Sequence, residues 1–323
     1  MTTDAIPLNQ PVAARKRYIQ PKKNYARRQG VNITMLTLTG LLCLVALIPL
    51  FWIIGYVIYR GGQYINLDFF IQTPKPMGVA GGGVLHAEEG TIILSLLAAL
   101  FSIPVGLLTA FYTAYHPNTI LGIIVRFGTD VLSGMPSIII GIVGYTLVVK
   151  PQGHFSALAG GVALALLMLP TIIRTTEEMI KLVPGTLREG SLALGAPEWR
   201  TALKVTIPAA ITGITTGFML GLARAAGETA PLLFTALGND RFELGKMISS
   251  GIQSHMNVFQ IIGNILEQPI DSLPLTLFKY TQQPDPTRVN QAWAVALVLM
   301  MLVLLTNIIA RVIIIMRSSQ RRG

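Results

Sequence analysis

The sequence predicts an all-α membrane protein with six transmembrane helices and both termini in the cytoplasm. Of its 323 residues, 52% are hydrophobic and only 12% are charged, whereas a soluble domain carries about 25% charged residues. Uncharged stretches close to the roughly 20 residues needed to cross a bilayer recur along the chain. Backbone groups in lipid must pair internally, so such stretches indicate helices, while a β-barrel would show short alternating strands.

The first three spans lie in the amino-terminal half. The first covers about residues 31–59, which carry no charge and are too long for the apolar part of a cleaved signal peptide. The second covers about residues 89–115. The third covers about residues 119–149 and exceeds a straight crossing. We expect a kink or break in it at Gly134-Met-Pro136, because proline interrupts helices.

The remaining three spans follow at about residues 156–176, 205–237 and 292–316. The fifth of the six, residues 205–237, is again longer than a straight crossing requires, so we expect tilt, a kink or a non-spanning end. It is also the span that contains Arg224. An arginine at membrane depth is costly and usually faces a protein interior or a water-filled path.

Lysine and arginine set the predicted orientation, because basic residues collect in cytoplasmic connections. Residues 1–30 form a tail with seven of the 25 Lys and Arg residues, and residues 318–323 form a second basic tail. An even number of spans places both tails on one side, which we expect to be cytoplasmic. The transmembrane domain then covers residues 31–317, with a cytoplasmic connection at residues 177–204 and an extracytoplasmic lobe at residues 238–291.

The net charge of +10 does not indicate a nucleic-acid-binding protein, because its largest cluster precedes the first span. There the basic residues act as a positive-inside signal, contact anionic lipid or belong to a solvated tail, and these roles are compatible. Membrane lipid is therefore the expected surrounding partner, and nucleic acid is not.

Several classes of site are not expected. Cys43 is the only cysteine, which excludes an internal disulfide and a thiolate metal site. Gly245-Lys246 is followed by Met247 and is not part of a phosphate-binding loop, so we expect no ATP site of that type. No nucleophile–base pair is visible, and we expect neither catalysis nor a cofactor on this chain. The histidines form no metal-ligand cluster and are interpreted as ordinary loop residues: His86, His116, His154 and His255.

Arg224 is the first candidate for the substrate path. On a continuous helix it falls within the stripe formed by Gly213, Gly217 and Gly221, with Glu228 one turn further on. Glycine at every fourth position lets another helix approach closely, so the charged pair is expected to face packed helices rather than lipid. Three roles stay open: contact with an anion, a self-neutralising pair that fixes packing, and a contact in assembly.

Arg174 is the second candidate, with Glu177 and Glu178 just after it. Its position at the end of a span also suits an arginine that reaches toward the lipid headgroups. If Arg174 and Arg224 faced one cavity, their planar guanidinium groups would suit an oxyanion such as phosphate. Nearby glutamates would keep that binding weak enough for release.

The cytoplasmic segment at about residues 184–204 contains the most specific pattern. Leu192, Gly195 or Ala196, and Trp199 recur at helical spacing and are expected to insert into a groove of a partner. The alternative is an interfacial helix that lies on the membrane.

This segment resembles the EAA loop in the permease subunits of ABC importers, which reads Glu-Ala-Ala, three residues, Gly, nine residues, then Ile-x-Leu-Pro. Glu189, Gly195 and Pro208 match at the same spacing. The departures are small-for-small or aliphatic exchanges: Gly190-Ser191 for Ala-Ala, Val205 for Ile and Ile207 for Leu. The resemblance implies that the segment docks on an ATPase subunit through Glu189, Gly195, Ala196 and Trp199.

Residues 170–178, 187–196 and 221–234 together look like the phosphate permease family of these importers, the PstA type. The resemblance implies a type I (MetI-like) permease fold in a bacterial inner membrane. It also implies a heterodimer with a sister permease (PstC), a PstB-type ATPase dimer that binds ATP and magnesium, and a PstS-type phosphate-binding protein. Arg174 and Arg224, with Glu177 as partner and Glu228 nearby, are the expected residues of the phosphate path.

The chain is therefore expected to be a non-catalytic permease subunit of an ATP-driven phosphate importer that works by alternating access. One alternative is a permease for another oxyanion, molybdate or sulfate. A second is an ion-driven carrier or channel that needs no ATPase, and a third is a scaffold that transports nothing.

Overall fold

The computed structural model describes residues 22–76, 79 and 81–319. Most of the predicted amino-terminal tail and residues 320–323 of the other tail lie outside the described residues. The chain divides into two units, residues 1–56 and 57–323. The first unit contains most of helix α1 (Lys22–Gly62), with Pro49 inside the helix. The core and the candidate site described below belong to the second unit.

The described part of the second unit is built from helices. Its long membrane helices are α3 (Leu85–Tyr115), α7 (Ala157–Lys181), α10 (Ile207–Ala226) and α15 (Pro286–Ser319). A bent span consists of α4 (Ile120–Gly134), α5 (Ser137–Gly144), the π-helical turn η1 (Tyr145–Val149) and α6 (Lys150–Gln152). The shorter helices are α2 (Leu67–Ile71), α8 (Gly185–Ala193), α9 (Glu198–Thr201), α11 (Ala230–Leu233), α12 (Leu244–Gln253), α13 (Val258–Glu267) and α14 (Leu273–Thr281).

The prediction of six spans agrees with the described helices when the bent span is counted as one. Five helices are long and apolar enough to cross a membrane, and the two halves of the bent span meet at an angle of 111°. The break falls at the predicted place, because Pro136 has no amide hydrogen and the residue before it, Met135, is extended with ψ at 134°.

The fifth span differs from its prediction at both ends. It begins at Glu198, where α9 continues through the π-helical turn η2 (Ala202–Thr206) into α10, and it ends at Ala226 rather than near residue 237. Gly227 caps the helix, and its amide donates to the Arg224 carbonyl at 3.1 Å. Helix α11, which begins at Ala230 and has Pro231 in its first turn, then occupies the apolar stretch predicted to be the end of this span.

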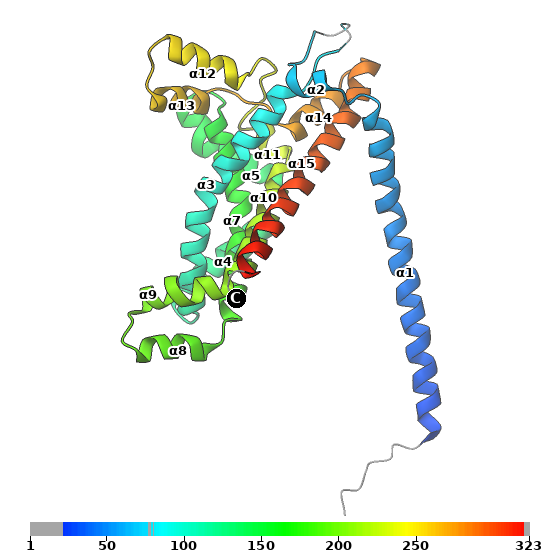
Figure 1. The fold of residues 1–323 in the computed structure, drawn as a ribbon, viewed down its shortest axis with the longest axis vertical. Helices are drawn as coiled ribbons and strands as arrows, with labels where there is room; N and C mark the ends of the chain where they lie inside the picture. The colour runs from blue at the N-terminus through cyan, green and yellow to red at the C-terminus, as the bar shows by residue number, and fades with distance from the viewer. Residues whose placement is uncertain (1–21, 77–78, 80, 320–323) are drawn as a thin grey trace, which may run out of the picture. The chain divides into compact units, whose positions relative to one another are not determined.

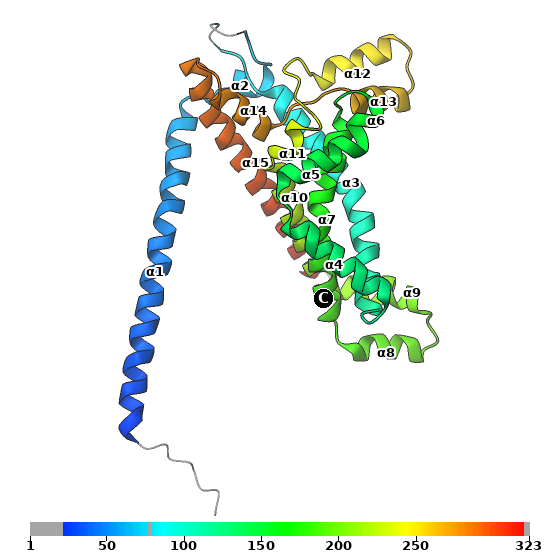
Figure 2. The same cartoon turned by 180° about the vertical axis from the view of Figure 1, so that it is seen from behind.

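The core is formed mainly by α3 and α7, which lie side by side with α10 beside them (Figures 1 and 2). Small residues allow this closeness: a Cβ at Gly161 of α7 would meet Leu97 of α3, and one at Gly106 of α3 would meet Ile172 of α7. A second apolar cluster joins α2, α14 and α15, and includes Phe69, Leu273 and Val295.

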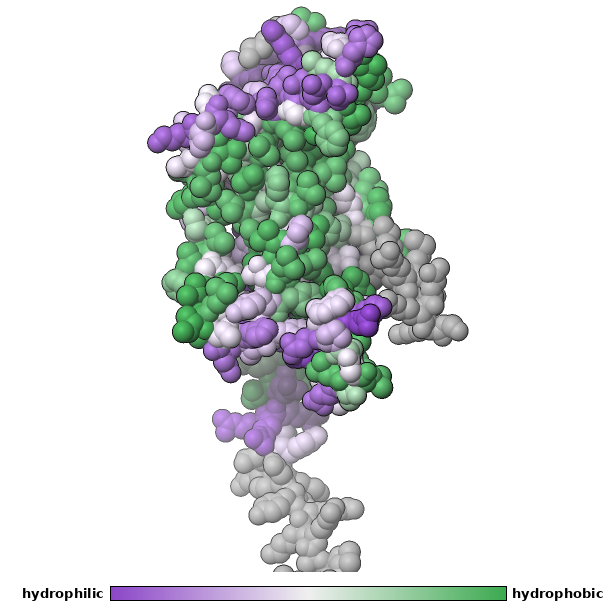
Figure 3. Space-filling view, turned by 90° about the vertical axis from the view of Figure 1, so that its left-hand side faces the viewer, coloured by the Kyte–Doolittle hydropathy of each residue, from purple (hydrophilic) through white to green (hydrophobic). Residues whose placement is uncertain are grey.

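The two ends of the unit differ from its middle. Helices α8 and α9 lie at one end, and α2, α12, α13 and α14 lie at the other (Figures 1 and 2). On the face shown in Figure 3, a broad hydrophobic belt separates hydrophilic residues at the two ends. This distribution is expected for a protein whose middle contacts lipid and whose ends contact water.

Candidate functional site

The site is organised by the contact between α7 and α10. Side chains of α7 fill the space over the three glycines of α10 predicted to receive another helix: Met179 lies over Gly213, Thr175 over Gly217, and Met168 with Ile172 over Gly221. Since the residue numbers rise on one helix as they fall on the other, the two helices are antiparallel. The prediction that a helix packs on this glycine stripe is confirmed.

This register also places the two candidate arginines. Arg174 of α7 lies level with about residue 218 of α10, whereas Arg224 lies about six residues further along that helix. At 1.5 Å per residue, the two arginines are offset by roughly 9 Å along the helix pair. They occupy successive depths, rather than the same level of one cavity.

Helices α4 and α7 are joined by two ion pairs. The Arg126 guanidinium of α4 binds the Glu177 carboxylate of α7 through Nε at 2.8 Å and Nη2 at 2.6 Å. Lys181 binds the same Glu177 oxygen at 2.6 Å. In the second pair, Arg174 of α7 contacts Asp130 of α4. Each helix therefore supplies one cation and one anion to this contact.

The first of these pairs is fixed in place. The Glu177 side chain is only 3% exposed. Arg126 also donates to the Pro117 carbonyl at 3.0 Å and to the Thr113 carbonyl at 2.7 Å, which ties the turn between α3 and α4 to α7. A charged group that is buried with several partners gives a defined geometry.

The predicted pairing of Glu177 with the path arginines does not form, because Glu177 pairs with Arg126 and Lys181. Glu177 and Arg174 are three positions apart on α7, and both turn to α4 instead. Neither Arg126 nor Asp130 was a predicted site residue. A signal was present, because both lie four positions apart in an otherwise apolar span and share one helix face.

Arg224 and Glu228 form the expected pair, with Nε and Oε1 separated by 3.6 Å. Their arrangement differs from the prediction, because α10 ends at Ala226 and Glu228 lies in the turn that follows. The Arg224 side chain is 47% exposed in this chain. It is therefore available to a ligand or to another subunit while Glu228 balances its charge.

The predicted docking segment is a pair of short helices rather than one continuous helix. Helix α8 ends in a glycine turn: the Gly195 amide donates to the Leu192 carbonyl at 2.9 Å, and the Ala196 amide donates to the Ser191 carbonyl at 3.2 Å. Gly195 has φ at 80°, a conformation that glycine adopts without the steric cost of a Cβ. The fixed position of the motif glycine is explained by this turn.

The turn changes how the docking segment presents its side chains. The helical spacing expected for Leu192, Gly195 and Trp199 is interrupted, so these residues do not form one stripe. Leu194 at the turn is 91% exposed and Trp199 at the start of α9 is 62% exposed. Glu189 lies on α8, and a 2.8 Å hydrogen bond between the Ser191 and Thr201 hydroxyls joins the two helices.

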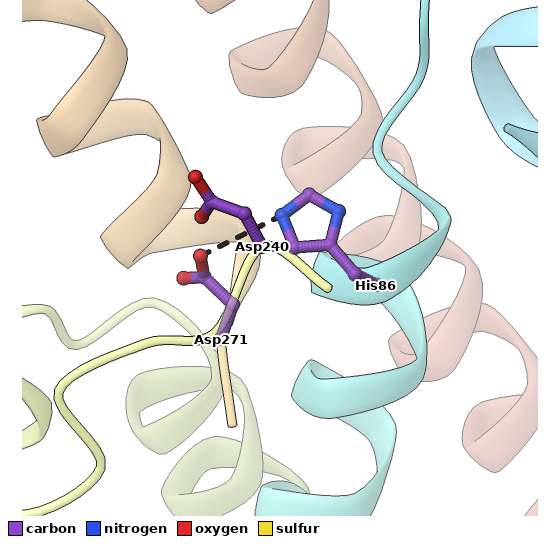
Figure 4. A group of neighbouring side chains, drawn as sticks. All are labelled: His86, Asp240 and Asp271. Atoms are coloured by element: carbon purple, nitrogen blue, oxygen red, sulfur yellow. Dashed lines mark ion pairs between the residues drawn. The ribbon is translucent and has the colours of Figure 1, made fainter. Parts of the chain in front are cut away.

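A polar cluster at the opposite end joins three segments (Figure 4). His86 on α3 and Asp271 before α14 are fully buried, with His86 Nε2 at 3.5 Å from Asp271 Oδ2. Lys279 of α14 contacts both Asp271 and Asp240.

These contacts shift the pKa values of two groups in the cluster. Burial alone would raise the pKa of Asp271, but His86 and the charge of Lys279 outweigh the effect of burial and lower that pKa. Burial lowers the pKa of Lys279, but the two carboxylates outweigh it and raise that pKa.

The same cluster offers a group of possible metal ligands. Atoms of His86, Asp240 and Asp271 lie within 4.8 Å of one another. Because the Lys279 ammonium contacts both carboxylates, a metal ion here would have to displace a cation that the chain already supplies. The interpretation of His86 as an ordinary loop residue is wrong, since it lies buried in the first turn of α3. The burial of His86 depends on tertiary packing, which the spacing of neighbouring residues in the sequence does not indicate.

Comparison with known proteins places the chain in a family. Residues 102–314 match the family "binding-protein-dependent transport system inner membrane component". The phosphate transport system permease protein PstA of Yersinia pestis is 40% identical over 293 residues, which cover 90% of this chain and 92% of the relative. PstA of Haemophilus influenzae is 37% identical, covering 88% and 94%. PstA 1 of Mycobacterium tuberculosis H37Rv is 34% identical, covering 92% and 91%.

Solved structures have the same fold. An inward-facing MetNI methionine ABC transporter matches with a TM-score of 0.50 and 20% identity, covering 72% of this chain and 92% of that chain. A bacterial ABC transporter involved in the import of alginate matches with a TM-score of 0.53 and 15% identity, covering 88% and 96%. The chain is thus a multi-pass inner membrane protein, and it belongs to the binding-protein-dependent permease family of ABC importers, within the group of phosphate transport system permeases.

Proposed function

We propose that this chain is the transmembrane permease subunit of an ATP-driven phosphate importer and forms half of its translocation path. The observation that carries the proposal is the pair of half-exposed arginines, Arg174 and Arg224, at successive depths on the packed α7–α10 pair. Charged side chains at such depths usually face a water-filled path. Relatives named as phosphate transport permeases along nine-tenths of the chain support phosphate as the anion.

The cycle we propose is alternating access. The α8–α9 end faces the cytoplasm, the side on which both termini are also proposed to lie. An ATPase dimer of the PstB type docks there on Glu189, Gly195, Ala196 and Trp199. ATP and magnesium are bound there and not on this chain. Since α9 continues into α10, motion of the docked ATPase is passed to the helix that carries Arg224.

The other partners follow from the same proposal. A PstC-type sister permease supplies the second half of the path and covers apolar surface that this chain leaves exposed. A PstS-type binding protein delivers phosphate at the α12–α14 end. Outward opening accepts phosphate from it, and inward opening releases phosphate past Arg174.

The test is ATP-dependent uptake of labelled phosphate into proteoliposomes that contain the four kinds of subunit, with binding protein supplied at the α12–α14 face. Arg224→Gln is compared with Arg27→Gln, a matched change at an exposed arginine of α1 that precedes the first predicted span. We expect uptake by the wild-type complex, loss in the Arg224 variant and no change in the Arg27 variant, with assembly unaltered.

Other outcomes identify the rival functions. Transport of sulfate or molybdate in place of phosphate would indicate another oxyanion permease. Anion flux from this chain alone would indicate an ATP-independent carrier or channel. Wild-type uptake in both Arg174→Gln and Arg224→Gln would remove the arginines from the path, and a complex that assembles but transports no anion would indicate a scaffold.

A further inference from the structure

The two ion pairs between α4 and α7 are built for different roles. Arg126 is held by Glu177 and by two backbone carbonyls, and that carboxylate is almost fully buried. The Arg174 and Asp130 side chains are 42% and 55% exposed. Asp130 is the acceptor that contacts the Arg174 guanidinium in the described part of the chain. The first pair fixes the helices, and the second can open without disturbing them.

We propose that Asp130 is an internal counter-ion that occupies the anion position on Arg174 and is exchanged for phosphate during transport. This inference rests on the proposed function and adds Asp130 to its path. A carboxylate and a phosphate present similar pairs of oxygens to the guanidinium fork. The oxygens of Asp130 therefore compete with those of phosphate for the same donors.

The exchange requires only movement of side chains. Arg126 lies one turn before Asp130 on α4 and is anchored to α7. Helix α4 therefore keeps its place when the ion pair between Arg174 and Asp130 opens. The guanidinium has five donors, and only one of them is engaged by a described acceptor, Asp130. Arg174 can thus turn to a ligand while its backbone stays packed on α10.

The exchange also keeps the charge of Arg174 neutralised both with and without phosphate. With no phosphate present, an unpaired guanidinium at membrane depth would be costly, and Asp130 neutralises it. With phosphate present, the returning carboxylate competes for Arg174 and limits the affinity. Conduction requires binding that is favourable enough for entry and weak enough for exit. Glu228 likewise pairs with Arg224, the second arginine of the proposed path.

The test is equilibrium binding of labelled inorganic phosphate to the permease–ATPase complex in lipid nanodiscs, without binding protein or nucleotide. Asp130→Asn removes the competing charge and keeps the side-chain size. Since an exposed ion pair is weak, we expect phosphate to bind about two- to fivefold more tightly. Maximal uptake in proteoliposomes should fall, because release becomes slower. Glu243→Gln, which removes a carboxylate paired with Lys246 of α12, should leave the affinity for phosphate unchanged in this measurement, which contains no binding protein.

A purely structural role of Asp130 would not tighten binding. In Arg174→Gln/Asp130→Asn, phosphate should bind no more tightly than in Arg174→Gln alone, because the competing charge has lost its target. If Asp130→Asn does not assemble, Asp130→Ser repeats the test with a small polar side chain. Wild-type binding of phosphate with no gain in either Asp130 variant overturns the inference and leaves the proposed function intact. A wild-type complex that neither binds nor transports phosphate overturns both.

Discussion

Gly217 of α10 lies against Thr175 of α7 with no room for a methyl group: a Cβ at position 217 would lie 2.5 Å from the Thr175 Cβ. Rotation about χ1 cannot move that Cβ, so the helices themselves would have to separate. This contact fixes the register of the two helices that carry Arg174 and Arg224.

Gly217→Ala is therefore expected to destabilise the complex by about 1–3 kcal/mol, the usual cost of overpacking a core. The measurement is thermal unfolding of the purified complex. Gly263→Ala in α13 is the matched control, because a Cβ there meets nothing within 4 Å and alanine favours the helix. Equal stability of the two variants would contradict the packing argument.

Glu177→Gln is expected to destabilise the complex by about 1–3 kcal/mol, because it leaves the Arg126 charge without its carboxylate in a largely buried position. The cost falls below that of a fully buried pair because Arg126 is 24% exposed and keeps two carbonyl acceptors. In Arg126→Gln/Glu177→Gln the loss should be smaller than the sum of the two single losses. Additive losses in thermal unfolding would show that the two residues do not interact.

Gly195→Ala is expected to uncouple the proposed importer more than it destabilises it. Its positive φ strains any residue with a Cβ by about 1–2 kcal/mol, which favours unwinding the last turn of α8. The measurement is stimulation of ATP hydrolysis by phosphate-loaded binding protein. Asparagine tolerates this backbone region better than alanine, so Gly195→Asn should retain more stimulation. The opposite order would exclude the backbone explanation.

Lys279→Met is expected to loosen the α12–α14 end and to change its dependence on pH. The lowered pKa of Asp271 stabilises the native state above the ordinary aspartate value of 3.8, and this contribution is lost as the pH falls through the native pKa. The raised pKa of Lys279 stabilises the native state below the ordinary value of 10.5, and this contribution is lost as the pH rises through the native pKa.

The difference in unfolding temperature between wild type and Lys279→Met should thus be largest near neutral pH and shrink toward both acid and alkaline pH. Lys246→Met, at an exposed ion pair on α12, is the control and should show little difference at any pH. A difference that grows steadily across the neutral range would contradict this account.

The spans could be predicted because a bilayer imposes a length on each apolar helix, and Pro136 could be placed at a break because its ring prevents the helix from continuing. The end of the fifth span was misplaced because hydropathy does not separate α10 from the short apolar helix α11 behind Gly227. The glycine stripe of α10 predicted that a neighbouring helix packs there, but it did not indicate that this helix is α7.

The sequence predicted some residues of the site but not all of their partners, because the partners depend on how the helices pack. Arg174 and Arg224 stand out as charges in apolar sequence, whereas the partner of each charge depends on how the helices pack. Asp130 lies 44 residues from Arg174, so no local spacing links them. The EAA resemblance located the docking segment. Its division into two helices at Gly195 depends on a positive φ that the sequence alone did not predict.

The break in the bent span has a consequence for solvation. The carboxyl end of one helix and the amino end of the next meet at the α4–α5 junction, in the middle of an apolar stretch, and such ends leave carbonyls and amides without helical partners. Local bonds satisfy some of these groups, because the Met135 amide donates to the Leu132 carbonyl and the Ile139 and Ile140 amides donate to the Pro136 carbonyl. Hydrocarbon cannot solvate the groups that stay unpaired. Those groups need protein or water beside them in the assembled membrane complex, so the backbone at this break marks a lipid-excluded zone independently of any charged side chain.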